Sequence, residues 1–564
     1  MTHPHSNQKR DETALDPISL SLLWGSFVSV TDEMGSTLRK TAYSQAVREA
    51  DDFSTGIFDR DGRLVAQGNF TPGHLGAMPF VVKTVLDYFP KETFKPGDGI
   101  LLNDSGMGSG HYPDCFLVSP VFVDEDLVGF TANIAHHVDI GGASAGSQKV
   151  FGVTEAYQEG LRILPIKAVN DGRFDESIMR FICGNVRMPD HLRGDMAAQR
   201  NANHVGAMRM EAIYRKFGTA ATERGIEEIF DRSEQKMRAL ISDMPQGTYS
   251  FDDALDPIEV GGEPIKVAVD ITVADGEVTI DFSRSSDQVP AAINSYLNFT
   301  RAHALFGVRA FTDPFMPQND GAVRPVTVTG RPGCFFNPVF PAPSGGRAAI
   351  QVRIFEVING ALSKIRPERS MAAFSHWSNP IIGGVDSDTG KPYIFYDLIF
   401  GGYGARQHAD GVEGLAPVIN CANIPVEVHE SGTPVIVRRL ELIQDSGGAG
   451  RHRGGCGMRK DIELRASSGT LTLLGDRHTR QPYGIFGGAP GSLASTSLQR
   501  AGETIELHSK QTVELKRGDV VSLRLAGAGG YGAPAERSKE AVARDLAEGY
   551  ISATAARDVY GYED

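Results

Sequence analysis

Two clusters of histidine and aspartate, each beside a predicted β-strand, constrain this chain more than any other feature. The first, His111-Tyr112-Pro113-Asp114, precedes an apolar run at 116–122. The second, His136-His137-Val138-Asp139-Ile140-Gly141-Gly142, follows an apolar run at 127–135. The runs are typical of a strand pair, and the glycines allow the backbone to turn tightly beside them. A fold that pairs these strands brings imidazole and carboxylate groups together.

Imidazole and carboxylate groups that converge in this way can hold one cation. Neutral imidazole with carboxylate oxygen suits Zn, Mn or Fe(II). No short spacing rule such as Cys-x-x-Cys accompanies the clusters, and a hydrogen-bonded His–Asp turn in an ordinary core is the alternative interpretation. His74, predicted in a loop, is a further candidate ligand or substrate contact, with a solvated loop histidine as its alternative.

The composition excludes several classes of protein. A net charge of −14 argues against nucleic-acid binding, which requires a basic surface. The hydrophobic fraction of 41% is that of a globular protein, and no run of about 18 apolar residues predicts a membrane span. Five scattered cysteines exclude a disulfide framework, so we expect a cytoplasmic location.

At 564 residues the chain exceeds a single hydrophobic core, and we expect a multi-lobed α+β fold with mixed sheets. Its 64 glycines and 30 prolines indicate many turns and short strands. We expect a disordered tail at 1–15 and an N-terminal α/β domain at 16–246 that carries the metal site and long helices. A middle α+β domain at 247–380 and a β-rich C-terminal lobe at 381–564 complete the prediction.

The local patterns predict several individual elements. Apolar residues at helical spacing predict a helix from Asp16 onward, and a loop at 71–79 precedes a helix at 81–88. The turn at 59–62 predicts a hairpin. The small-residue loop Pro341–Arg347 opens a predicted helix, where it could bind phosphate or carboxylate.

Several short segments occur along the chain in a characteristic order. They are Asp52-Phe53-Ser54, His74-Leu75-Gly76-Ala77-Met78-Pro79, the two His/Asp clusters, Asp445-Ser446-Gly447-Gly448-Ala449-Gly450, Arg453-Gly454-Gly455 and Gly529-Gly530-Tyr531-Gly532. In this order the segments resemble the hydantoinase B/oxoprolinase family over roughly residues 16–560. One loop departs from the family pattern: Ser105-Gly106-Met107-Gly108-Ser109-Gly110 precedes His111 where the family usually has Asn-Asp-Pro-Tyr-x-Gly-Gly-Thr-His. That difference keeps the histidine and leaves the substrate preference open.

The resemblance implies a metal site and a partner. Its metal ligands would be Asp52, His111, Asp114 and His137, with His136 as an outer or alternative ligand. Asp139 would join the four ligands in catalysis and is the other alternative ligand. The metal would be a divalent ion, and ATP with Mg would bind to a hydantoinase A-like partner subunit, in a hetero-tetramer with two copies of each chain.

The resemblance also implies the activity. The expected function is that of the B-type subunit of an ATP-dependent hydrolase of cyclic amides, such as hydantoins, oxoproline or lactams. A subunit of an ATP-dependent ketone carboxylase is the alternative within the family. A non-catalytic scaffold for the partner is a third possibility, against which the intact His/Asp set weighs, because buried charges without a ligand are costly.

Overall fold

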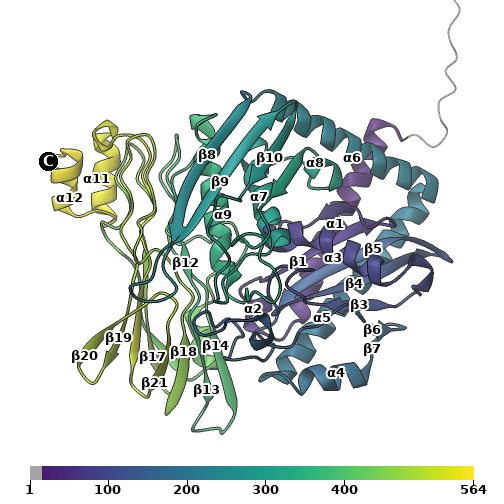
Figure 1. The fold of residues 1–564 in the computed structure, drawn as a ribbon, viewed down its shortest axis with the longest axis horizontal. Coiled ribbons are helices and arrows are strands. Elements are labelled where there is room, and N and C mark those ends of the chain that lie inside the picture. The colour runs from purple at the N-terminus through teal and green to yellow at the C-terminus, as the bar shows by residue number, and fades with distance from the viewer. Residues whose placement is uncertain (1–14, 564) are drawn as a thin grey trace, which may run out of the picture.

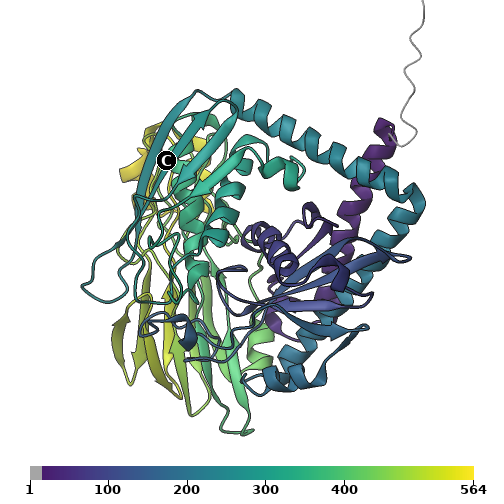
Figure 2. The ribbon, with the colours of Figure 1, turned by 45° about the vertical axis from the view of Figure 1, so that its right-hand side comes forward.

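The computed structural model describes residues 15–563, so the predicted tail lies outside the described residues except for Leu15. Several separate mixed sheets with packed helices confirm the expected multi-lobed α+β fold. The N-terminal sheet and the C-terminal strands lie on opposite sides of the molecule, with the middle segment joining them (Figures 1 and 2). All five cysteines are free thiols. Within residues 15–563, every helix is too short or too polar to cross a lipid bilayer.

A seven-stranded antiparallel sheet forms the N-terminal part, in the order β2-β1-β5-β4-β3-β6-β7. It includes the predicted hairpin and the predicted strand pair between the two His/Asp clusters. Its strands are β1 (Phe53–Asp59), β2 (Leu64–Gln67), β3 (Gly99–Leu102), β4 (Asp114–Val123), β5 (Asp126–His136), β6 (Ile166–Asn170) and β7 (Arg173–Phe174).

Helices cover both faces of this sheet. On one face, α1 (Pro17–Thr41) and α5 (Pro189–Phe217) share a hydrophobic core with β1. The helix predicted from Asp16 onward is α1, and Asp16 caps it, because its carboxylate accepts hydrogen bonds from the amides of Ile18 and Ser19. The short helix α2 (Gln45–Arg48) follows α1 in the chain, and the short helix α4 (Glu176–Cys183) precedes α5.

The other face is covered by α3 (Pro72–Tyr88), which is longer than the sequence predicted. The loop expected at 71–79 is helical, with Pro72 in the first turn and Pro79 inside the helix. A proline removes one backbone hydrogen bond, but Leu75 and Met78 are buried against the sheet, and tertiary packing outweighs that loss. His74 is therefore held on a helix above the sheet.

The middle part contains a four-stranded sheet ordered β11-β10-β9-β8, which shares one hydrophobic core with α7 and α9. The helix α9 begins after a short 3-10 turn, Arg347–Ile350. The elements are α6 (Thr219–Ser242), β8 (Gly247–Leu255), β9 (Ile265–Ala274), β10 (Glu277–Asp281), α7 (Leu297–Thr312), α8 (Asp320–Val323), β11 (Val326–Thr329) and α9 (Gln351–Leu362).

Two sheets of the C-terminal part, β14-β13-β18-β21 and β16-β17-β22-β19-β20, contribute to one hydrophobic core, and β12 pairs with β15 separately. Glycine-rich turns join them; a Cβ at Gly527 would lie 1.7 Å from the Ser446 carbonyl oxygen, which requires glycine there. The strands are β12 (Trp377–Ser378), β13 (Ile381–Val385), β14 (Pro392–Tyr396), β15 (Ile399–Phe400), β16 (Val435–Leu442), β17 (Met458–Leu464), β18 (Ser468–Thr472), β19 (Ser495–Arg500), β20 (Glu503–Leu507), β21 (Thr512–Lys516) and β22 (Val520–Arg524). The helices are α10 (Val426–Gly432), α11 (Lys539–Ala547) and α12 (Ala553–Tyr560).

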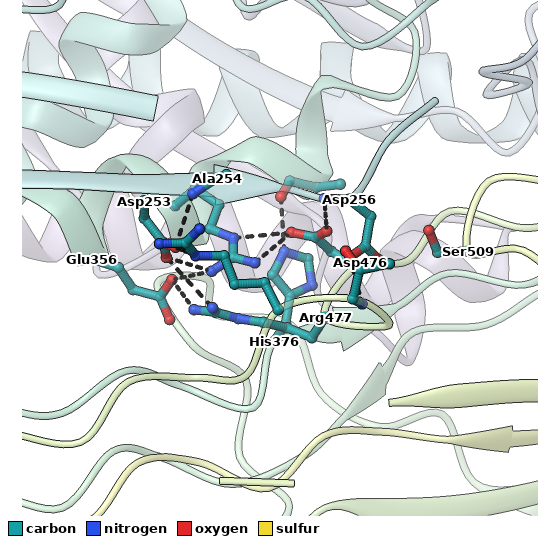
Figure 3. A network of polar contacts seen from close by, with 12 residues as sticks. Asp253, Ala254, Asp256, Glu356, His376, Asp476, Arg477 and Ser509 are labelled. Carbon is teal, nitrogen blue, oxygen red and sulfur yellow. Dashed lines mark hydrogen bonds and ion pairs between the residues drawn. The ribbon is translucent and has the colours of Figure 1, made fainter. Parts of the chain in front are cut away.

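A buried ion network joins the middle part to the C-terminal part (Figure 3). Arg353 of α9 is fully buried and bonds Asp253 of β8 at 2.8 Å and Asp476 at 2.8 Å. Arg477 bonds Glu356, also on α9, at 2.6 Å. Because α9 begins directly after the turn that starts at Arg347, this network fixes the segment that carries Arg347.

Candidate metal centre

Strand register brings three of the expected residues together at one end of the N-terminal sheet. Asp114, at the start of β4, is paired directly with His136, at the end of β5. The amide of His136 donates a 3.0 Å hydrogen bond to the carbonyl of Asp52, which immediately precedes β1. Residues that face one another in an antiparallel pair project to the same side, so Asp114 and His136 share the face covered by α3.

His111 presents an unprotonated nitrogen to Asp114. Its Nδ1 lies 2.9 Å from the carbonyl oxygen of Gly345, which only accepts hydrogen bonds, so Nδ1 carries the proton. Burial, followed by the Arg347 charge, lowers the pKa of His111 to about 4, and the ring is neutral at pH 7. The Nε2 lone pair therefore faces Asp114 Oδ1 at 2.9 Å with no hydrogen-bond donor between them. Two acceptors this close require a cation or a proton.

His136 approaches the same carboxylate oxygen. Its Nδ1 lies 3.0 Å from Asp114 Oδ1, and its Nε2 lies 3.2 Å from the side-chain amide of Gln148. The oxygen and nitrogen of a glutamine amide are interchangeable by rotation. With the Gln148 oxygen toward the ring, Nε2 carries the proton and Nδ1 is free to act as a ligand.

The second oxygen of Asp114 is held by the protein. His74 Nε2 lies 3.3 Å from Oδ2, and the Ser109 hydroxyl and the Arg347 guanidinium also donate to it. Burial alone would raise the pKa of Asp114, but the neighbouring His111, Arg347 and His74 side chains outweigh burial and hold it well below its ordinary value. Asp114 is thus a buried carboxylate at neutral pH.

Asp52 lies at the edge of this group. Its oxygens are 3.9 Å from His74 Nε2 and 4.0 Å from His136 Nδ1. Burial and then the Asp52 charge raise the pKa of Cys421 well above its ordinary value, so the neighbouring Cys421 remains a thiol. Asp52 therefore lies beside the space between His111, Asp114 and His136, where it can contact a bound ion from the edge.

His137 and Asp139 lie outside this group. The strand alternation directs His137 to the opposite face from His136, where its Nε2 is 3.1 Å from Gln199 of α5. Both carboxylate oxygens of Asp139 accept hydrogen bonds from backbone amides of Gly141 and Gly146 and from Arg187, which orders the loop after β5. In the position expected for His137, the structure places His136.

The group lines a cavity of about 20 Å³, which holds one ion or one water molecule. The ligand atoms of His111, Asp114 and His136 lie within 4.8 Å of one another. Two imidazoles and a buried carboxylate, with unprotonated His111 Nε2 facing carboxylate oxygen, are a fitting donor set for Zn, Mn or Fe(II).

The sequence misplaced some cavity residues and missed others. His74 was a candidate ligand or substrate contact predicted in a loop, whereas it lies on α3. Arg347 was named only as part of a loop that could bind an anion. Gln148, Gln351, Trp377 and Tyr396 carried no recognisable motif, because they come from the loop after β5, from α9 and from two C-terminal strands.

The model of the hydantoinase B/oxoprolinase family matches residues 16–534. The chain belongs to this family. Among its relatives is the beta subunit of caprolactamase from Pseudomonas jessenii, which is 30% identical over 97% of this chain and 96% of that protein. The B-type subunit of a putative D-/L-hydantoinase from a Pseudomonas species is 29% identical over 100% of this chain and 97% of that protein.

Solved structures agree with this placement. The crystal structure of ATP-dependent caprolactamase from Pseudomonas jessenii matches 97% of this hydantoinase B-family chain and 96% of that chain, with a TM-score of 0.89 and 28% identity. An acetone carboxylase structure matches 97% of this chain and 79% of that chain, with a TM-score of 0.88. Its identity of 19% shows a shared fold alone.

Glu159 holds the loop that contacts His111 of the candidate metal centre in this hydantoinase B-family chain. Its Oε1 accepts hydrogen bonds from the amides of Ser344 and Gly345, and the Gly345 carbonyl in turn holds His111. The loop expected to bind an anion therefore binds a carboxyl group of the protein itself. Glu159 Oε2 is buried without a hydrogen-bond partner among the described residues.

Burial raises the pKa of Glu159 from 4.5 to about 8, and the two amides only partly oppose that shift. In the unfolded chain the Glu159 carboxyl group ionises near pH 4.5, whereas in the folded chain it keeps its proton. The contribution of Glu159 to stability is therefore fully present below pH 4.5 and is lost as the pH rises toward 8. We expect Glu159→Gln, which keeps the acceptor, to remove this loss, about 1.4 kcal/mol per pH unit in that window. Chemical unfolding at about pH 5.5 and about pH 7.5, both inside the window, measures it.

The matched variant Glu159→Ala separates charge from hydrogen bonding. It leaves the amides of Ser344 and Gly345 without their acceptor, and we expect it to lower stability at both pH values. Equal pH dependence in the parent protein and in Glu159→Gln would show that Glu159 is ionised in the folded protein at neutral pH.

Proposed function

We propose that this chain is the B-type subunit of an ATP-dependent cyclic-amide hydrolase and that its reaction takes place at the cavity around Asp114. The observation that carries the proposal is the convergence of His111, Asp114 and His136 in one buried cavity. The relatives named as a hydantoinase subunit and a caprolactamase subunit support the substrate class.

The proposed ligands are His111, Asp114 and His136, with Asp52 and His74 at the edge of the site. A divalent ion held there would polarise a carbonyl group and lower the pKa of a bound water. Gly345 fixes the tautomer of His111, and Arg347 holds the second oxygen of Asp114. These contacts orient the donors before any ligand binds.

Three donors in the cavity wall are available to a substrate. Trp377 Nε1, Gln351 Nε2 and Arg347 Nε are buried without hydrogen-bond partners among residues 15–563, and all three residues line the cavity. Unpartnered N–H groups that face a site can donate to an oxygen on which negative charge develops. A cavity of about 20 Å³ is too small for a cyclic amide, so this wall moves when substrate binds.

In the proposed reaction, ATP binds to a partner subunit and not to this chain. A cyclic amide is a poor electrophile, and phosphorylation of its oxygen makes the ring carbon more electrophilic. Water would then add to that carbon, the ring C–N bond would break, and phosphate would be released as the carboxylate forms. The relatives carry the names of a B-type and a beta subunit, which supports a partner that binds ATP and Mg. Because a phosphorylated amide is unstable in water, the two kinds of subunit would form a stable complex, with two copies of each.

An assay of the purified two-subunit complex tests the substrate class. We expect ATP-dependent ring opening of a hydantoin, 5-oxoproline or a simple lactam, without any requirement for bicarbonate. The reason is that hydrolysis takes its oxygen from water, whereas carboxylation consumes bicarbonate. Product formation is followed by chromatography, with and without added bicarbonate.

Small ketones provide the comparison in the same assay. Bicarbonate-dependent consumption of acetone or acetophenone, with every cyclic amide unchanged, would replace the hydrolase by a ketone carboxylase. A complex that binds its partner but turns over neither class would support the scaffold instead.

A further inference from the structure

A second and larger cavity lies on the other side of α3 from the metal centre. Its volume is about 430 Å³, and its walls are α3, α6, α7 and α8 together with the β1–β2 turn (helices labelled in Figure 1). None of the residues that line it also lines the metal cavity. Gly76 of α3 packs against Ala302 of α7, and a Cβ added to Gly76 would lie 2.6 Å from Ala302 Cα. Both residues line the cavity.

Most of the cavity wall is apolar. A volume of about 430 Å³ lies within the range of sites for small organic ligands, roughly 300–1,000 Å³. A ligand with a hydrocarbon or aromatic body would bury apolar surface against this wall. The apolar contributors include Leu64, Leu75, Phe80, Met237, Leu305 and Phe306.

The cavity wall includes two arginines that form no ion pair with a carboxylate of residues 15–563. Arg301 is partly buried, its guanidinium lies 5.1 Å from the centre of the Phe80 ring, and it makes no hydrogen bond or ion pair with a described residue. Arg309 donates one hydrogen bond, to the Pro314 carbonyl at 2.6 Å, and its Nε is buried without a partner among the described residues. Burial lowers the pKa of Arg309 to about 10. Burial also lowers the pKa of Arg301, with Asp320 opposing that shift. Arginine side chains in proteins are cationic at neutral pH.

The two acidic residues of the wall are already engaged. Asp61 pairs with Lys91 at 2.5 Å, and Asp320 pairs with Arg324 at 2.9 Å. Arg63, the other arginine in the wall, pairs with Asp59 and Glu227. The charge of Arg301 is therefore not balanced by a direct contact with any residue in 15–563. A desolvated guanidinium without a partner is costly, and its planar donors match a carboxylate.

We propose that this cavity is a binding site for a small organic carboxylate with an apolar body, in which Arg301 binds the carboxylate and the α3/α7 side chains contact the body. The site is independent of the metal centre and of the proposed reaction. An apolar wall of this size beside an unpaired guanidinium selects an anion over a neutral or cationic molecule of the same length.

Isothermal titration calorimetry with octanoate tests the site on the full-length chain. We expect saturable binding of one octanoate per chain, and binding at least about tenfold weaker for octan-1-ol, octylamine and acetate. The alcohol and the amine lack the carboxylate, and acetate lacks the apolar body. No saturable octanoate binding at millimolar concentration would overturn the proposal.

Two variants locate the binding. Arg301→Leu should weaken octanoate binding at least about tenfold by removing the guanidinium, and Leu305→Trp should weaken it similarly by filling the apolar end. Arg209→Leu is the matched control, because Arg209 is exposed, pairs with Glu33 and lies outside the cavity. Thermal melting confirms that each variant is folded. Octanoate binding unchanged in both cavity variants would place the ligand elsewhere and refute the assignment.

Discussion

Replacing His136 by glutamine should remove both the bound divalent ion and the cyclic-amide hydrolysis, whereas the same replacement of the adjacent His137 should leave both nearly intact. His136 Nδ1 lies 3.0 Å from Asp114, while His137 faces Gln199 on the opposite side of the sheet. We expect His136→Gln to lower metal affinity by at least about 100-fold and ring opening to below about 1% of the parent complex. Elemental analysis of protein purified without chelator measures the first effect, and the two-subunit assay measures the second.

The neighbouring histidines form a matched pair, because both are buried and each contacts a glutamine side chain through its Nε2. His137→Gln should cost about 1 kcal/mol of stability through its contact with Gln199, with metal content unchanged. Metal lost in His137→Gln and retained in His136→Gln would assign the ligand to His137. Full metal content in both variants would exclude both histidines as ligands.

Arg353→Met should lower the free energy of unfolding by about 3–5 kcal/mol, although Arg353 itself does not line the candidate metal cavity. Arg353 contacts Asp253, Glu356 and Asp476, three carboxylates labelled in the buried network of Figure 3. Its removal leaves these carboxylates buried with too few cations. Arg477 is the other buried arginine in contact with two of these carboxylates. Methionine keeps the volume, so the loss reports charge rather than a void. Denaturant unfolding measures the effect.

An exposed arginine provides the control. Arg232 pairs with Glu228 one helical turn away on α6, and Arg232→Met should change stability by less than about 0.5 kcal/mol. The variant Arg353→Lys keeps a charge but loses the paired geometry toward Asp476 and should lie between the parent and Arg353→Met. A loss below about 1 kcal/mol in Arg353→Met would show that water replaces the guanidinium in this network.

The sequence by itself determined the local elements and the chemical character of the site. Apolar periodicity predicted α1 from Asp16 onward, and the turn at 59–62 predicted the β1–β2 hairpin. The two His/Asp clusters were correctly placed at the ends of β4 and β5, because a strand ends where its apolar alternation ends. The donor types that suit a divalent ion were therefore recognisable without any structure.

Only the tertiary structure decided which donors meet. Adjacent residues of a strand face opposite sides, so a one-residue difference in register exchanges His136 for His137, and register is set by pairing with β1 and β4. His74 required packing of a proline-containing helix on the sheet, and Arg347 required the loop held by Glu159. Tyr396 comes from a strand more than two hundred residues from Asp114 in the chain. Such long-range contacts depend on how whole layers pack, which no local pattern encodes.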